Sequence, residues 1–163
     1  MILKDIKDED FVNYYKPSML LSFPNCSFKC DKECGLRVCQ NSSLAKAPNI
    51  NIDIYTLCAR YLCNPLTKAI VCGGLEPMDS FDDLYSFIFT LRYEYNCKDD
   101  VVIYSGYTIA ECEKNDWVKK LSCMGNIIIK FGRFIPNQKA HYDEMLGVNL
   151  ASDNQRAVKF RPL

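Results

Sequence analysis

Four cysteines in one short polar segment are the residues of this chain best suited to do chemistry. Cys26, Cys30, Cys34 and Cys39 lie shortly after the apolar run 19–23, with gaps of three, three and four residues between them. Thiols this close in sequence can converge on one metal centre, and thiolates are the usual ligands of four-iron clusters. The alternative is a closed tetrahedral zinc site, although zinc knuckles usually pair their cysteines as Cys-x2-Cys. The spacing therefore favours an iron–sulfur centre over a zinc-stabilised interaction module.

A second motif, Gly73-Gly74-Leu75-Glu76-Pro77, follows another apolar run at 69–72. Because glycine has no side chain, Gly73 and Gly74 would let the backbone approach a ligand closely, although a simple strand-to-helix turn also uses glycine. Glu76 could accept a hydrogen bond from a ligand ammonium group; otherwise it is a solvated acid near a helix start. Together with the cysteines, this motif predicts a site for a nucleotide-like cofactor.

Both motifs need secondary structure to position them, and the hydrophobic pattern predicts an α/β chain. Apolar runs predict strands over residues 18–23, 69–72, 101–104 and 127–131. Helical spacing predicts helices over 53–62, with Asp53 as N-cap, from 79 or 80 to about 95, and from about 108 to 115 with a continuation over 116–121. Such alternation is typical of a parallel sheet. The mixed-charge stretch 4–10 predicts a solvated segment, and the tail after Arg133 has no clear period and is expected to wrap the sheet edge.

The predicted topology brings the candidate residues together. Ligands of a parallel α/β sheet bind outside the carboxyl ends of the strands. The cysteine segment, Gly73-Gly74, Ser105-Gly106 and Gly132 each follow closely after a predicted strand. We therefore expect all four segments to meet at one edge of the sheet.

Length and composition limit the class of protein. The 163 residues fit one domain spanning 1–163. Twenty basic and twenty acidic residues give a formal charge of zero, which argues against a nucleic-acid partner bound by bulk charge. No apolar run approaches the ~20 residues of a membrane helix, and the charged start argues against a signal peptide. We expect a cytoplasmic protein without a membrane partner, whose ten cysteines stay reduced rather than forming a secreted disulfide scaffold.

The order of the motifs resembles that of the radical S-adenosylmethionine enzymes, and most closely the activating proteins of anaerobic ribonucleotide reductase. That family carries Cys-x3-Cys-x2-Cys with an Asn soon after, then Gly-Gly-Glu-Pro, a Tyr-x-Gly-Tyr-type strand end, a Gly-Arg-Phe-like turn and a late Asn-Gln-Arg. The matching segments span about Phe23 to Arg156 and are Cys26-x3-Cys30, Cys39-Gln40-Asn41, Gly73-Gly74-Leu75-Glu76-Pro77, Tyr104-Ser105-Gly106-Tyr107, Gly132-Arg133-Phe134-Ile135 and Asn154-Gln155-Arg156.

This resemblance implies a radical SAM type fold, a partial (β/α) barrel with a mainly parallel open sheet. It implies two cofactors, a 4Fe-4S cluster and S-adenosylmethionine. The cluster would reduce S-adenosylmethionine to methionine and a 5′-deoxyadenosyl radical, which would take a hydrogen atom from a glycine of anaerobic ribonucleotide reductase. An electron donor such as flavodoxin or ferredoxin would supply the electron. The alternative is another radical enzyme on the same scaffold, acting on a small molecule or a peptide.

The resemblance also implies roles for individual residues. The expected cofactor-binding residues are Gly73, Gly74, Glu76, Pro77, Tyr104, Ser105, Gly106 and Lys130. Residues 104–106 would line the adenosine side of the cofactor, or simply end a strand. Lys130 interrupts an apolar strand, so it would either face the cofactor carboxylate or snorkel to the surface. Asn154 and Gln155 would belong to a cofactor or partner surface, or to a polar tail.

Two departures from the family pattern affect these expectations. Eight residues separate Cys30 from Cys39, where the family has two between its second and third cysteines. Alignment on the following Asn makes Cys26, Cys30 and Cys39 the cluster ligands, whereas alignment on spacing makes Cys34 the third ligand; we favour Cys39. The other departure is Leu75, which is inserted into Gly-Gly-Glu-Pro and shifts Glu76 by one residue.

Overall fold

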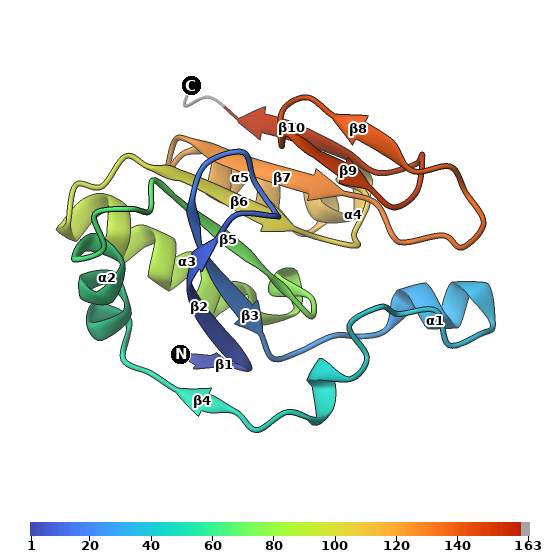
Figure 1. Cartoon of the computed structure of the whole chain (residues 1–163), viewed down its shortest axis with the longest axis horizontal. Coiled ribbons are helices and arrows are strands. Elements are labelled where there is room, and N and C mark those ends of the chain that lie inside the picture. Colours follow the sequence, from blue (N-terminus) through green and yellow to red (C-terminus); the bar gives the residue numbers. More distant parts are fainter. Residues whose placement is uncertain (161–163) are drawn as a thin grey trace.

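The computed structural model describes residues 1–160 and places a mixed, open, six-stranded sheet at the centre of the protein (Figure 1). Across the sheet the strands run in the order β10-β7-β6-β5-β3-β2. The four predicted strands are confirmed as its parallel centre: β3 (Ser18–Phe23), β5 (Ala69–Gly74), β6 (Asp100–Tyr104) and β7 (Ile127–Phe131). Their carboxyl ends therefore lie at one edge of the sheet.

The period of two along these strands divides the core between the two faces of the sheet. Ile70, Cys72, Val101 and Ile103 face the main hydrophobic core. Their neighbours Ala69, Val71, Val102 and Ile128 face a smaller cluster on the other side, with Tyr14, Leu146 and Leu150. Because both faces are covered, the central strands read as continuous apolar runs in the sequence.

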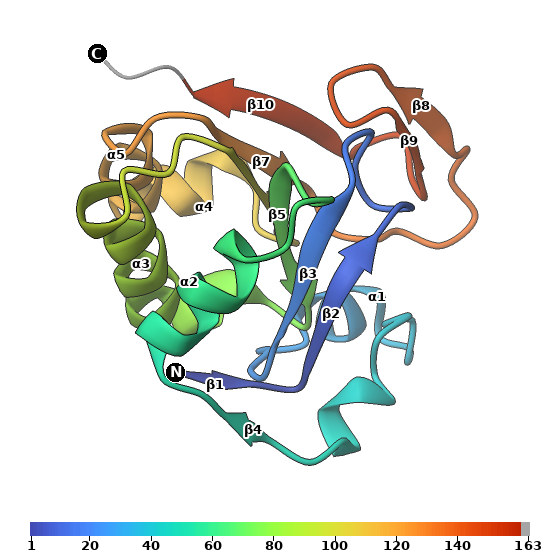
Figure 2. The same cartoon turned by 60° about the vertical axis from the view of Figure 1, so that its left-hand side comes forward.

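Helices cover the face with the larger core, as Figure 2 shows. They are α2 (Ile54–Leu62), α3 (Phe81–Phe89), α4 (Ile109–Lys114) and α5 (Trp117–Ser122). The carboxylate of Asp53 accepts from Thr56 N, which confirms the predicted cap of α2. The helix predicted to run to about residue 95 begins with the 3-10 turn η2 (Pro77–Ser80) and ends as the π-helical turn η3 (Thr90–Glu94). Asp116 adopts φ 57°, so α4 and α5 are separate helices.

The two edge strands were not predicted. β2 (Asp5–Asp10) pairs antiparallel with β3, and β10 (Arg156–Phe160) pairs antiparallel with β7. The segment 4–10 is thus a strand, and its charged side chains stay at least partly exposed, as predicted, except that of Asp10, which is buried; an edge strand tolerates such charges because one side of it lies in water. Ile6 packs against the core. The tail does lie at the sheet edge, where Val158 and Phe160 pack against the same core.

Short elements complete the chain. They are β1 (Ile2–Leu3) paired with β4 (Ile50–Asn51), the hairpin of β8 (His141–Asp143) and β9 (Val148–Leu150), the 3-10 turn η1 (Leu44–Lys46) and the helix α1 (Lys29–Cys34). Each helix within residues 1–160 is too short or too polar to cross a lipid bilayer. The sheet is open and mixed, and the partial-barrel curvature of a radical SAM type fold stays a prediction.

Candidate functional site

A cavity of about 460 Å³ lies at the carboxyl ends of the parallel strands. Segments after each of the four strands contribute to its walls, as expected for ligand sites of parallel sheets. The predicted site residues that line it are Cys26, Cys30, Cys39, Gly73, Gly74, Glu76, Tyr104, Ser105, Gly106 and Lys130. Pro77 is not among the lining residues; it begins the turn η2.

The cysteine segment enters this cavity with three of its four thiols. Cys26, Cys30 and Cys39 line the cavity, whereas Cys34 ends the helix α1 and does not. Burial raises the pKa of Cys26 to about 11 and also raises the pKa of Cys30, and the neighbouring Cys39 adds to both shifts. Metal binding here would therefore release protons. Among residues 1–160, no three His, Cys, Asp or Glu side chains stand close enough together to hold a metal ion.

The helix α1 buries no residue and is held by charge instead. Lys29 Nζ lies 2.9 Å from Glu111 Oε1, and Arg133 Nε lies 3.1 Å from Glu33 Oε1. Arg133 Nη2 also donates to Glu111 Oε1 at 2.6 Å. Arg133 is itself buried. The sequence pattern singled out Arg133 only as part of a turn motif and gave Glu111 no role, because long-range ion pairs leave no local signal.

The two glycines of the second motif have different surroundings. Gly74 adopts φ +80°, and a Cβ there would lie 2.7 Å from Ser22 Cα and 3.0 Å from Leu44 Cδ2. Gly74 is therefore required by close backbone packing and by its left-handed conformation. A Cβ on Gly73 would meet nothing closer than 3.7 Å. The wall of the cavity could therefore accommodate a Cβ at Gly73 in ordinary contact, and the fold does not require glycine there.

Glu76 is not the solvated acid that the sequence allowed, since it is only 6 % exposed. Its Oε1 accepts from Ser105 Oγ at 2.9 Å and from Met78 N at 3.1 Å, and its Oε2 accepts from Gly106 N at 2.7 Å. Burial raises the pKa of Glu76 to about 7, although the backbone hydrogen bonds act in the opposite direction. Three of about four acceptor sites are occupied. The carboxylate therefore ties the end of β5 to the end of β6, and a contact with a ligand ammonium stays a prediction.

Lys130 is 7 % exposed, so the alternative of a snorkelling surface lysine is wrong. Its ammonium donates to the carbonyl oxygens of Gly132 at 2.9 Å and Ser105 at 3.3 Å. Burial lowers the pKa of Lys130 to about 8, while the nearby Glu76 carboxylate raises it. An ammonium has three donors, so one remains for an anionic group in the cavity.

Several residues of the walls were not predicted. The N-terminal loop contributes Asn13, whose carbonyl accepts from Tyr104 Oη at 2.5 Å. The β8–β9 hairpin and the segment after it contribute residues 149–151. Asn13 and residues 149–151 come from elements that the sequence pattern did not reveal. Gln155, for which a cofactor or partner surface was one predicted alternative, lines the cavity and donates to Gly132 O at 3.2 Å, whereas Asn154 is not among the lining residues.

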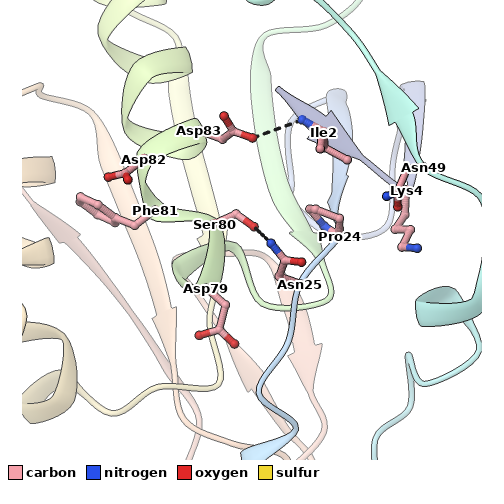
Figure 3. A pocket seen from close by; sticks show the side chains of 10 residues that line it. All are labelled: Ile2, Lys4, Pro24, Asn25, Asn49, Asp79, Ser80, Phe81, Asp82 and Asp83. Atoms are coloured by element: carbon pink, nitrogen blue, oxygen red, sulfur yellow. Dashed lines mark hydrogen bonds between the residues drawn. The ribbon is translucent and has the colours of Figure 1, made fainter.

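A second cavity, of about 380 Å³, lies on the helix-covered side near the N-terminus (Figure 3). Two hydrogen bonds join its lining residues: Ile2 N donates to Asp83 Oδ2 at 3.2 Å, and Asn25 Nδ2 donates to Ser80 Oγ at 2.9 Å. Asp79 also borders it. No cysteine and no residue of the glycine motif lines this cavity, so we place the chemistry in the larger one.

The donor type in the larger cavity suits an iron–sulfur cluster, although the three thiols do not converge as a metal-binding group in this structure. Three thiols from one segment line it, and thiolates are the usual ligands of such clusters. If these three cysteines held a four-iron cluster, they would leave one iron free to bind another molecule. The adjoining wall at Gly73 has no side chain, and Lys130 supplies a positive charge.

Comparison with known proteins gives one match. A family model described as a 4Fe-4S single cluster domain matches residues 18–158. The matched range contains all four cysteines of the segment and the parallel centre of the sheet. No curated protein and no solved structure matches the chain.

Proposed function

Because the chain belongs to the family of 4Fe-4S single cluster domains, we propose that it is a radical S-adenosylmethionine enzyme that activates anaerobic ribonucleotide reductase. The observation that carries this proposal is that one cavity is lined both by possible cluster ligands and by possible cofactor-binding residues. The ligands are Cys26, Cys30 and Cys39, and the cofactor-binding residues are Gly73 and Lys130. The ordered motifs that resemble the activating proteins support the finer assignment.

In this proposal Cys26, Cys30 and Cys39 would hold the cluster, which would supply the one electron needed to cleave S-adenosylmethionine. Gly73 lets the methionine end of the cofactor lie against the backbone, because a Cβ there would occupy that space. The free donor of Lys130 binds the cofactor carboxylate. Glu76 holds Ser105 and Gly106 in position through its hydrogen bonds.

The proposal extends to the partners. The 5′-deoxyadenosyl radical takes a hydrogen atom from a glycine of the reductase, which yields 5′-deoxyadenosine and a glycyl radical. A flavodoxin or ferredoxin supplies the electron. A cytoplasmic location fits ten free cysteines, because the cytoplasm keeps thiols reduced. The parallel centre of the sheet and its ligand-binding end are compatible with a radical SAM type fold.

The proposal is tested by anaerobic reconstitution of the full chain with iron and sulfide. We expect a brown protein with visible absorbance, whose iron content falls when Cys26, Cys30 or Cys39 is replaced by Ser but not when Cys34 is. With dithionite it should convert S-adenosylmethionine to methionine and 5′-deoxyadenosine. Mixed with an anaerobic ribonucleotide reductase, it should give a glycyl radical signal in electron paramagnetic resonance.

Each stage has an outcome that contradicts the proposal. A colourless protein with stoichiometric zinc would instead identify an interaction module. A brown protein that leaves S-adenosylmethionine intact would be an iron–sulfur protein of another kind. Cofactor cleavage without a glycyl radical would favour a radical enzyme that acts on a small molecule or a peptide.

A further inference from the structure

The segment between Cys30 and Cys39 leaves the cavity and returns to it. From Cys30 the chain continues through α1, which projects away from the sheet (Figure 1). Gly35 then adopts φ 65° and reverses the chain direction. Because eight residues separate Cys30 from Cys39, the return path needs a specific interaction if Cys39 is to reach the same cavity as Cys30.

The side chain of Asp31 provides that interaction. Its Oδ1 accepts hydrogen bonds from Val38 N and from Cys39 N, both at 2.8 Å. A carboxylate that accepts two backbone N–H groups makes charge-assisted hydrogen bonds, which are stronger than neutral ones. The residue directly after one predicted ligand thus binds the backbone of the next predicted ligand.

The chain is also fixed just beyond Cys39. Asn41 Nδ2 donates to Gly74 O at 2.7 Å, which attaches the returning chain to the glycine motif. Cys39 therefore lies between two anchored positions. Cys34 stands at the far end of α1 and does not line the cavity.

The simpler role for Asp31 is that of an acidic residue in the first turn of a helix, where it complements the helix dipole. That role would not require contact with residues seven and eight positions later. Glu33, on the same helix, shows the contrast: its carboxylate is exposed and pairs with Arg133. Only the Asp31 carboxylate is directed back to the returning chain, among the acidic residues of α1.

We propose that Asp31 is a positioning residue for the cluster: by closing the inserted segment 31–39 on itself, it delivers the Cys39 sulfur, and not that of Cys34, to the cavity as the third ligand. This rests on the cluster site of the proposed function. The eight residues between Cys30 and Cys39 are then compatible with a three-cysteine site, because the Asp31 side chain restricts the conformations of this longer segment.

The test compares Asp31→Ala, Asp31→Asn and Lys32→Ala in the full chain. In metal-free protein, alkylation of Cys39 is measured by mass spectrometry against Cys34 of the same molecule. Loss of two charge-assisted hydrogen bonds should raise the Cys39 rate about tenfold in Asp31→Ala. Asn keeps an oxygen that accepts both bonds, so Asp31→Asn should remain near wild type. Lys32→Ala changes an exposed residue of the same helix that takes part in none of its ion pairs, and it should leave the Cys39 rate unchanged.

After anaerobic reconstitution, Asp31→Ala should bind less iron and lose the 4Fe-4S signal of the reduced protein, while Asp31→Asn should retain both. Circular dichroism should show the native fold in every variant, because α1 buries no residue. If Asp31→Ala keeps wild-type Cys39 reactivity and iron content, the positioning role is refuted. If wild-type protein assembles no cluster, the proposed function fails, but the alkylation ratio still decides the role of Asp31 in closing the segment.

Discussion

Adjacent glycines in one motif carry different constraints. Gly74 must be glycine for the fold, because its φ is positive and Ser22 Cα lies 2.7 Å from where a Cβ would stand. A Cβ on Gly73 would make only ordinary contacts, at 3.7 Å from Tyr104 Cβ and 3.9 Å from Leu20 Cδ1. Protein packing therefore does not require glycine at position 73, and a ligand in the cavity could be what does.

Substitution of each glycine by alanine should separate these two constraints. Gly74→Ala combines backbone strain with overpacking and should lower the free energy of unfolding by about 2 kcal/mol or more. Gly73→Ala should change it by less than about 1 kcal/mol. Urea titration of the metal-free protein provides the measurement. In the loaded protein, Gly73→Ala should weaken S-adenosylmethionine binding; equal destabilisation by both variants would show that Gly73 is also a packing residue.

At the level of the elements, Glu111 joins two helices that are far apart in the sequence. It completes the capping box of α4, where Thr108 N donates to Glu111 Oε2 at 2.9 Å. Its other oxygen accepts from Lys29 of α1 and from Arg133. The hydrogen bond from Arg133 holds the pKa of Glu111 well below its ordinary value, although partial burial acts against this. Glu111 therefore anchors the cysteine segment to the helical layer.

Two variants should distinguish the anchor from the cap. Glu111→Gln retains a hydrogen-bonding side chain but loses the charge that attracts Lys29 and Arg133, so α1 should detach more often. Trypsin at neutral pH should then cleave after Arg37 faster than in wild type. Thr108→Ala loses the cap, worth about 1 kcal/mol, and should leave cleavage after Arg37 unchanged. Faster cleavage in both variants to the same extent would mean that α4 stability, and not the ion pairs, retains α1.

The elements that could be predicted from the sequence are those whose pattern arises from burial. The four central strands and α2 are apolar at the positions that face the core. β2 was missed because Asp5, Lys7 and Asp8 carry no apolar period, and only pairing with β3 makes the segment a strand. β10 was missed because Arg156 and Lys159 interrupt its apolar residues.

The site could be predicted only in part, for a related reason. Cysteine spacing and glycine pairs are local signals, and topology brings their segments to one edge of the sheet. The partners that fix them are distant: Ser105 binds Glu76, and Arg133 binds Glu111. Such pairs depend on the assembled fold. Asp31 is an exception, since an acid beside Cys30 and within reach of Cys39 could have been suspected from the inserted length alone.

For the molecule as a whole, Asp100 links strands and loops that are distant in the sequence. It is the first residue of β6 and is almost completely buried. Its carboxylate binds Lys16, before β3, and lies 2.9 Å from Lys159 Nζ on β10, and it accepts from Tyr14 Oη at 3.1 Å. Burial alone would raise the pKa of Asp100, but the hydrogen bonds from the two lysines outweigh burial and lower it.

This charge cluster predicts how stability depends on pH. Because the folded pKa of Asp100 lies below its ordinary value of 3.8, its contribution is present above pH 3.8 and is lost as the pH falls further. Asp100→Asn should cost about 2 kcal/mol at pH 7, since two partly exposed lysines lose a buried partner. The difference from wild type should shrink below pH 3.8. Asp153→Asn, at an exposed aspartate, is the control in thermal unfolding; a pH-independent difference for Asp100→Asn would contradict this account.

The charges of the edge strand β2 affect whether molecules of this protein associate with one another at high concentration. Five of its six side chains are charged, and its outer backbone groups are left without a neighbouring strand in the sheet order. A second molecule that tried to extend the sheet there would have to bring its own strand against a row of mostly negative charges. Edge-to-edge association through β2 is therefore disfavoured. A surface that binds another protein would have to lie elsewhere on the molecule.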